Sequence, residues 1–373
     1  NTAFTGLVSF VFWQCQRSFI TLACVRFSIS LGWMQLSVDV CRVRWWTKVV
    51  AISVLLLFVS IVARAQSDAR MRQYMFNQLD FNPGYAGSQG MINVYALARQ
   101  QWVGFGAGAP QTFFVNFDIP VGYRKLSQMS PGRKMQYSHG FGLHLMRDAI
   151  GFGSTNGVEL AYSGRFHLRA LGSLAFGLGL RALNDQFNAK WQTAVAAEND
   201  PAIPKEKANG IAFDLSFGMY YTARNMYFGV SGQNLLGADL RNQLSRNVSK
   251  IGRVNYARQY YVVGGYDIAV ASRWNLEPHF LARTDWQQYL LSLNLNARYN
   301  NLFWFGLGYN VTESVGALAG IILFDTFRIG YSYDYPVGAI RQFSTGSHEL
   351  VVGYSFGLAR QTQPQQYKSI RYL

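Results

Sequence analysis

The octapeptide Leu291-Ser-Leu-Asn-Leu-Asn-Ala-Arg298 alternates apolar side chains at odd positions with polar side chains at even positions. A period of two indicates a β-strand, because successive side chains of a strand point to opposite faces. One apolar and one polar face suit a strand with lipid on one side and a filled lumen on the other. The stretch therefore predicts a membrane-spanning strand.

The same alternation recurs along most of the chain, for example in Leu174–Arg181, Phe213–Met219 and Phe327–Asp334. Several segments exceed nine residues, the length that a tilted membrane strand needs. We predict about fourteen strands, an even number as in bacterial outer-membrane barrels. Their expected spans are 91–102, 110–121, 138–148, 153–167, 172–185, 209–221, 224–233, 256–270, 273–284, 288–299, 302–310, 312–324, 325–335 and 348–357.

Composition favours the same fold class. Hydrophobic residues make up 50% of the chain and aromatic residues 16%, but charged residues only 14%, where soluble domains have about a quarter. No apolar run after residue 66 approaches the ~20 residues of a spanning helix. We therefore predict an all-β fold, a transmembrane antiparallel outer-membrane β-barrel over 91–357 with a short N-terminal periplasmic segment. A large soluble β-sandwich protein is the less favoured alternative.

The connections predict the orientation. The long ones, 186–208, 234–255 and 336–347, follow odd-numbered strands, and most of those after even-numbered strands are tiny. Because outer-membrane barrels have short periplasmic turns and longer external loops, both termini are expected in the periplasm. Residues 358–373 are then a polar periplasmic tail, and the long connection 122–137 is an exception. Strand glycines such as Gly177 are expected to relieve crowding where strands bend.

Residues 42–65 have the parts of a signal peptide: a basic start, an apolar run over 49–62 and the motif Ala63-Arg64-Ala65. We expect the mature protein to begin at Gln66. Residues 1–41 are interpreted as a translated upstream region or an unusually long leader. A membrane anchor through 49–62 is the alternative, although that run is short for a span.

Cysteine and charge limit the chemistry. All three cysteines lie within residues 1–41, so the expected mature chain has no disulfide framework and no thiol nucleophile. The formal net charge is +15; residues 1–65 hold six Arg or Lys and one Asp, which leaves about +10. No nucleic-acid motif accompanies this charge. We expect basic loops to meet anionic outer-membrane lipid or an acidic partner, and no nucleic acid.

The segment 66–90 lacks both hydrophobic periods, although it is rich in aromatic residues and contains the turn signal Asn82-Pro83-Gly84. It is either a strap that plugs or seals the barrel floor or a docking segment for a periplasmic partner. The candidate docking residues are Gln73, Tyr74, Phe76, Asn77, Asn82, Pro83 and Tyr85.

Short motifs in this region resemble the start of the PorP/SprF family of type IX secretion system membrane proteins. The motifs are Gln73-Tyr74-Met75-Phe76-Asn77, Asn82-Pro83-Gly84-Tyr85-Ala86-Gly87 and Arg99-x-Gln101-Trp102-Val103-Gly104, with Tyr333-Asp334-Tyr335 and Ser344–Leu350 near the end. The resemblance implies a component of the cell outer membrane that supports secretion or surface attachment of cargo, including gliding adhesins. It also implies periplasmic lipoprotein ring components and a peptidoglycan-binding protein as partners.

Polar residues on the inward face of the predicted strands carry both signs of charge. They form either a lumen filled with paired side chains or a solute-selective pore, so a general porin or small-solute transporter is the alternative function. The candidate lumen residues are Arg181, Asp214, Asn294, Asn296, Arg298, Arg328 and Asp334.

We expect no enzymatic activity, no cofactor and no metal site. The five histidines are scattered without the spacing of zinc ligands. A Ser–His–Asn outer-membrane lipase is a distant third possibility, which no Gly-x-Ser-x-Gly motif supports.

Overall fold

The computed structural model describes residues 11–13, 24–31, 34–39, 71–122, 136–168, 171–187, 208–237 and 257–357. The chain divides into two compact units, 1–64 and 65–373. In the first unit, β1 (Val11–Trp13), β2 (Cys24–Leu31) and β3 (Met34–Asp39) form a small antiparallel sheet. The expected signal peptide, the cleavage site before Gln66 and the expected tail at 358–373 lie outside the described residues.

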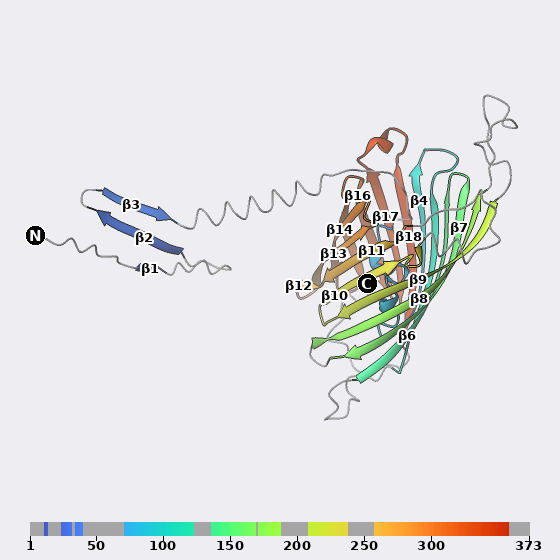
Figure 1. The fold of residues 1–373 in the computed structure, drawn as a ribbon, viewed down its shortest axis with the longest axis horizontal. Helices are drawn as coiled ribbons and strands as arrows, with labels where there is room; N and C mark the ends of the chain where they lie inside the picture. The colour runs from blue at the N-terminus through green and yellow to red at the C-terminus, as the bar shows by residue number, and fades with distance from the viewer. Residues whose placement is uncertain are drawn as a thin grey trace, which may run out of the picture. The chain divides into compact units, whose positions relative to one another are not determined.

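The second unit contains one large antiparallel sheet in which most strands pair with their neighbours in the sequence (Figure 1). The strands are β4 (Ile92–Val103), β5 (Gln111–Val121), β6 (Gln136–Ile150), β7 (Gly153–His167), β8 (Ser173–Phe187), β9 (Ala208–Thr222), β10 (Met226–Gln233), β11 (Gln259–Tyr266), β12 (Ile268–Ala271), β13 (Trp274–Thr284), β14 (Tyr289–Tyr299), β15 (Phe303–Asn310), β16 (Ser314–Leu323), β17 (Phe327–Pro336) and β18 (Gly346–Phe356).

Two pairings close this sheet into a barrel. The last strand, β18, pairs with the first, β4, and β11 pairs directly with β13 and not with β12. Closure leaves no open sheet edge with unpaired backbone groups, which lipid does not tolerate. With β11 and β12 taken as one interrupted crossing, the described residues form fourteen crossings, and the predicted outer-membrane barrel is confirmed.

The interruption in the eighth crossing differs from the prediction of one strand over 256–270. Asp267 separates β11 from β12, and the register shifts between Ala269 and Ala271. The Asp267 carboxylate accepts hydrogen bonds from Arg298, at 2.8 Å, and from Asn275. The register on β13 is continuous across Asp267, from Gly265 opposite His279 to Ile268 opposite Leu276, so the crossing continues past this residue. The extra residue lies further along, between Ala269 and Ala271, as at a β-bulge.

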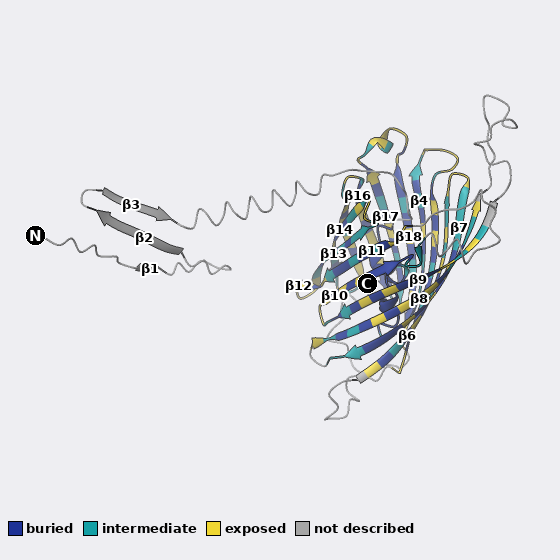
Figure 2. Cartoon of the chain, in the orientation of Figure 1, coloured by how far each residue is buried: buried dark blue, intermediate teal, exposed yellow. Residues whose placement is uncertain are grey.

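Burial alternates along the strands as the sequence pattern predicts (Figure 2). On β14, Leu293 and Leu295 are 41% and 48% exposed, whereas Asn294 and Asn296 are 3% and 1% exposed. The apolar face of this strand therefore points outward to lipid and the polar face points into the lumen. All seven candidate lumen residues are buried.

The two ends of the barrel differ. At the end here called the loop end, the connections include residues 188–207 and 234–258. At the opposite end, the turn end, the connections have two to five residues, except for 122–135. In outer-membrane barrels the loop end is external and the turn end is periplasmic. The long connection at 122–135 is thus a feature of the turn end and not a miscounted strand.

Among the described residues before β4, the chain forms three short helical turns: η1 (Tyr74–Phe76), α2 (Gln78–Phe81) and η2 (Pro83–Tyr85). Another short helical turn, η6 (Ala339–Gln342), lies in the connection between β17 and β18. No helix in the described part of the chain is both long and apolar enough to cross a bilayer.

The outward face of β14 provides a test of how deeply its residues lie in the bilayer. Leu293 lies near the middle of the strand and Tyr289 begins it, and both are exposed. We expect Leu293→Arg to destabilise the barrel in lipid by about 2–4 kcal/mol and Tyr289→Arg by about 0–1 kcal/mol, because the cost of a cation falls toward the interface. Refolding equilibria in lipid vesicles measure both. Equal costs would contradict the assigned depth.

Candidate functional site

The lumen is filled by residues 71–90, here called the plug. Every residue from 71 to 89 is buried except Asp80. Arg72 contacts Ser314 and Asp334, which lie near the loop end, and Gly87 lies against Pro120 near the turn end. The plug therefore runs along the inside of the barrel. It is not a strap across the periplasmic mouth.

This position corrects the interpretation of the seven candidate docking residues. All seven side chains are buried against the barrel wall or within the plug. Asn77, for example, accepts a hydrogen bond from Asn116 of β5 at 2.5 Å. In this conformation their polar and aromatic groups are used inside the lumen, so they present no surface to a separate partner.

Glu349 of β18 holds the start of the plug. Its carboxylate accepts hydrogen bonds from the backbone N–H groups of Arg72 and Gln73, at 2.7 and 2.8 Å. It also accepts one from Nη1 of Arg99, on β4, at 2.9 Å. Arg99 and Glu349 are register partners across the pairing that closes the barrel.

Asp334 of β17 completes this network. It accepts a hydrogen bond from Nε of Arg72 at 2.5 Å, and its second oxygen lies 2.8 Å from Nη2 of Arg99. Two arginines and two carboxylates are thus buried together with no net charge. Pairing is required here, because an unpaired buried charge costs several kcal/mol.

A second network holds α2. The carboxylate of Asp80 lies 3.0 Å from Nε2 of His144 and 3.7 Å from Nη2 of Arg181. Arg181 also forms an ion pair with Glu159 at 2.6 Å. Enclosure in the lumen by itself raises the pKa of Asp80, but the nearby His144 and Arg181 outweigh it and hold that pKa below its ordinary value.

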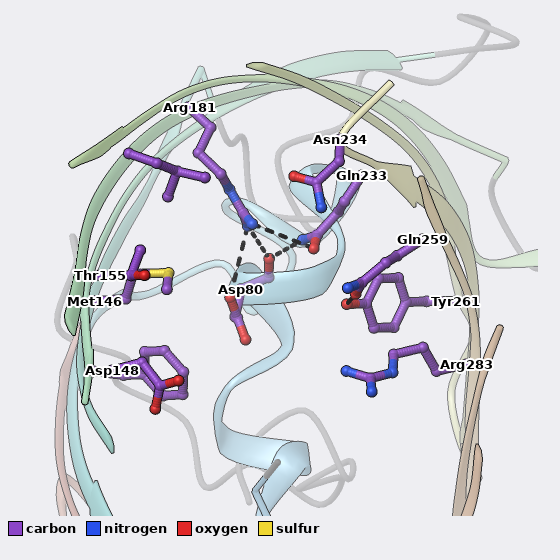
Figure 3. Close-up of a pocket in the computed structure, with 12 residues that line it drawn as sticks. Asp80, Met146, Asp148, Thr155, Arg181, Gln233, Asn234, Gln259, Tyr261 and Arg283 are labelled. Carbon is purple, nitrogen blue, oxygen red and sulfur yellow. Dashed lines mark hydrogen bonds and ion pairs between the residues drawn. The ribbon is translucent and has the colours of Figure 1, made fainter. Parts of the chain in front are cut away.

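A polar cavity lies above this network at the loop end (Figure 3). It encloses about 540 Å³ together with the open space at its mouth. Asp80, from the plug, contributes to its lining and is 21% exposed there. Figure 3 shows the wall residues of β8, β10, β11 and β13 directed toward it, namely Arg181, Gln233, Gln259, Tyr261 and Arg283.

Aromatic rings of the plug pack against rings of the wall. Phe76 lies between Tyr95 and Trp304, with ring centroids 5.8 and 5.5 Å away. Tyr85 meets Tyr220 edge to face at 5.5 Å. Such contacts stabilise a structure beyond the burial of apolar area, by about 0.5–1.5 kcal/mol per pair.

Strand glycines give the plug backbone room to approach the wall. A Cβ atom added to Gly177 would lie 2.2 Å from the backbone nitrogen of Gly84, and one added to Gly140 would lie 2.1 Å from the carbonyl oxygen of Ala86. The expectation that Gly177 relieves crowding at a strand bend is therefore wrong. Any side chain at this position would collide with the plug.

The remaining candidate lumen residues have different partners. Asn294 donates a hydrogen bond to the carbonyl oxygen of Arg72 at 2.7 Å, so it joins Arg181 and Asp334 in contacting the plug. The others contact the wall or neighbouring backbone: Arg298 pairs with Asp267 and Glu277, Arg328 donates to Ser355, and Asp214 accepts from Leu215 and Leu236. For Asn296 the structure shows burial in the lumen.

Sequence reasoning predicted Arg181, Asn294 and Asp334 as lumen residues. It missed four others that hold the plug, namely Arg72, Asp80, Arg99 and Glu349. Glu349 was detectable, because it alternates with the outward Leu350 and therefore faces inward. Arg72 lies in the segment 66–90 and Arg99 begins the motif Arg99–Gly104, but no contact was predicted for either residue. No local sequence pattern indicated that Asp80 would contact the barrel wall. Among the described residues, no group of three or more His, Cys, Asp or Glu is arranged to hold a metal ion.

The fold and its filled lumen define a plugged barrel of the outer membrane. The chain matches the family described as type IX secretion system membrane protein PorP/SprF over residues 63–354. Because the match covers most of the chain, this protein belongs to the PorP/SprF family, as the motifs predicted. A comparison with curated proteins found no match.

Solved structures share the barrel at low identity. The Ralstonia pickettii toluene transporter TbuX is 9% identical, with a TM-score of 0.45, over 77% of this chain and 93% of that chain. The P. putida toluene transporter TodX is 10% identical, with a TM-score of 0.42, over 75% and 93%. A Pseudomonas aeruginosa FadL homologue is 10% identical, with a TM-score of 0.41, over 77% and 94%.

The contacts of Glu349 predict that removal of its carboxylate loosens the plug inside the barrel. Glu349→Ala leaves two buried N–H groups of the plug and one guanidinium N–H without this acceptor, a loss of about 3–5 kcal/mol. A cysteine introduced into the plug can report on its exposure, because residues 66–373 contain no other cysteine. With Met75→Cys as the background, we expect Glu349→Ala to make the buried thiol reactive toward a maleimide added to the folded barrel.

The matched control is Leu350→Ala, which removes the outward side chain next to Glu349. It should leave the thiol protected. Equal labelling of all three proteins would show that Glu349 does not hold the plug.

Proposed function

We propose that this protein is a non-enzymatic component that supports secretion or surface attachment of cargo proteins, of the gliding-adhesin type. It acts through contacts with periplasmic ring lipoproteins of the type IX system and with a peptidoglycan-binding partner. Membership of the family supports this proposal at the level of the secretion system, and the filled lumen supports it against the porin alternative.

The filled lumen is the observation that carries the proposal. A diffusion porin needs an aqueous channel along its axis. Here the plug lies along the lumen and is held by two charge networks, around Glu349 and around Asp80. A barrel whose interior is used for its own packing is suited to act as a membrane anchor for an assembly.

Partner contacts then fall on the surface, and the turn end faces the periplasm. Two of its turns expose large apolar side chains: Phe324 is 89% exposed and Leu171 is 70% exposed. Exposed arginines, Arg224 and Arg273, lie in other turns of the same end. Aromatic and arginine side chains are enriched at protein interfaces.

The backbone at Phe324 supports a role for that turn. Phe324 and Asp325 have φ angles of 53° and 59°, in the left-handed region that disfavours residues other than Gly, Asn and Asp. A strained conformation of this kind costs about 1–3 kcal/mol and is common at functional sites. Here the strain accompanies a phenylalanine that is almost fully exposed.

We expect the double substitution Leu171→Ser with Phe324→Ser to reduce cargo secretion and the co-purification of periplasmic partners, at least several-fold. The reason is that contact residues of this kind each contribute about 1–2 kcal/mol to an interface. Cargo in the medium and mass spectrometry of the purified outer-membrane complex provide the readouts. The barrel itself should remain folded, as judged by heat-modifiable migration.

Phe343→Ser is the control, because Phe343 is a 63% exposed phenylalanine at the opposite end. It should secrete and co-purify like the unaltered protein. Normal secretion by the double variant would refute partner contact at these turns.

The plug gives a separate test of the porin alternative. We expect the full-length protein to show no steady conductance in planar bilayers, and deletion of residues 71–90 to open a conducting channel. The deletion removes the side chains that fill the lumen, whereas the turn variant leaves them in place and should stay closed. Steady conductance by the intact protein would favour the porin.

A further inference from the structure

A groove on the outer wall of the barrel has no role in the function proposed above. It crosses β18, β4, β5 and β6, next to the pairing that closes the barrel. The groove holds about 890 Å³ together with the open space in front of it. It lies on the surface that faces lipid, so its occupant is a component of the membrane or of its interface.

Strand register arranges the outward side chains of this wall in rows. One row is apolar until its last member: Leu350, Ala98, Phe113 and Arg147. The next row toward the loop end is polar in its first three members: His348, Gln100, Gln111 and Ala149. The row on the other side is entirely apolar: Val352, Ala96, Val115 and Leu145.

These rows locate the groove at the edge of the apolar band. Apolar side chains cover the wall up to the row of Ala98, and amides replace them one row further. Lipid head groups lie where the outward face of a barrel changes from apolar to polar. The groove therefore spans the boundary between acyl chains and head groups at the loop end.

Arg147 is the cation of this groove. Its side chain is exposed on the outward face of β6, and among the described residues it has no carboxylate or hydrogen-bond acceptor as partner. The other two charged residues of the lining, Arg99 and Glu349, are buried in the lumen and paired with each other. The outward charge of the groove is thus positive.

We propose that this groove binds a phosphorylated lipid of the leaflet at the loop end. Its phosphate lies against Arg147, because a guanidinium offers a planar pair of donors that matches phosphate. The amide groups of Gln100 and Gln111 supply further donors one row away. An acyl chain of the lipid lies over Ala98, beside Phe113 and Leu350.

Two features favour a lipid over an acidic protein segment. The groove continues from the polar row into the apolar rows, which suits a molecule with a phosphate head and a hydrocarbon chain. At Ala98 and Ala149 small side chains lie between larger ones, which leaves room for a hydrocarbon chain. His348, fixed by a hydrogen bond to Tyr331 at 2.5 Å, borders the head-group side.

The test uses delipidated, folded full-length protein and native mass spectrometry. The probes are lipid A with its phosphate groups and the same lipid after removal of the phosphates. We expect the unaltered protein to retain one phosphorylated lipid A in preference to the dephosphorylated form. Arg147→Gln should weaken that binding about tenfold, as expected for loss of a charge-assisted contact, and Arg147→Lys should retain part of it.

Two variants complete the design. Arg341→Gln removes an exposed arginine from the connection between β17 and β18 at the same end, outside the groove, and should bind normally. Ala98→Trp fills the floor of the groove and should displace the lipid while Arg147 is still present.

The proposal is overturned by any of three results. Arg147→Gln binds as tightly as the unaltered protein; both forms of lipid A bind equally; or cross-linking from the groove in cells captures an acidic protein segment in place of lipid.

Discussion

The buried carboxylate of Glu349 connects the two features on which the molecule depends. On one side it pairs with Arg99 across the junction of β18 and β4, where the barrel closes. On the other side it accepts hydrogen bonds from the backbone N–H groups of Arg72 and Gln73, near the start of the plug. Closure of the barrel and seating of the plug therefore share one charged group, and each supports the geometry of the other.

This coupling explains why the lumen tolerates so many buried charges. Arg72, Arg99, Asp334 and Glu349 neutralise one another, and Asp80, Glu159, Arg181 and His144 form a second cluster. Each charge has a partner from a different strand or from the plug. Removing one member leaves the others buried without compensation, which costs more than the pair contributes. The interior is consequently specific for this one arrangement of the plug.

Because the plug uses the interior, interaction with other molecules is left to the outer surfaces. The turn end presents Phe324 and Leu171, and the wall near the loop end presents the groove with Arg147. The two surfaces differ in chemistry, one with apolar tips and the other with a cation at head-group depth. Under the two proposals made above, the wall near the loop end binds lipid while the turn end contacts periplasmic partners.

The sequence by itself determined the strands, their facing and the class of protein. Alternation alone was sufficient to predict that Leu293 faces lipid and Asn294 the lumen, because a strand has a side-chain period of two. Motifs around Asn82 and Arg99 were sufficient to predict the family. Only the tertiary structure decided where the plug lies and which residues hold it. Arg72 and Glu349 are 277 positions apart, and no local pattern encodes a pairing over that distance. Gly177 likewise looked like an ordinary strand glycine, since its real constraint, the backbone of Gly84, comes from a segment that is distant in the sequence and close only in the folded barrel.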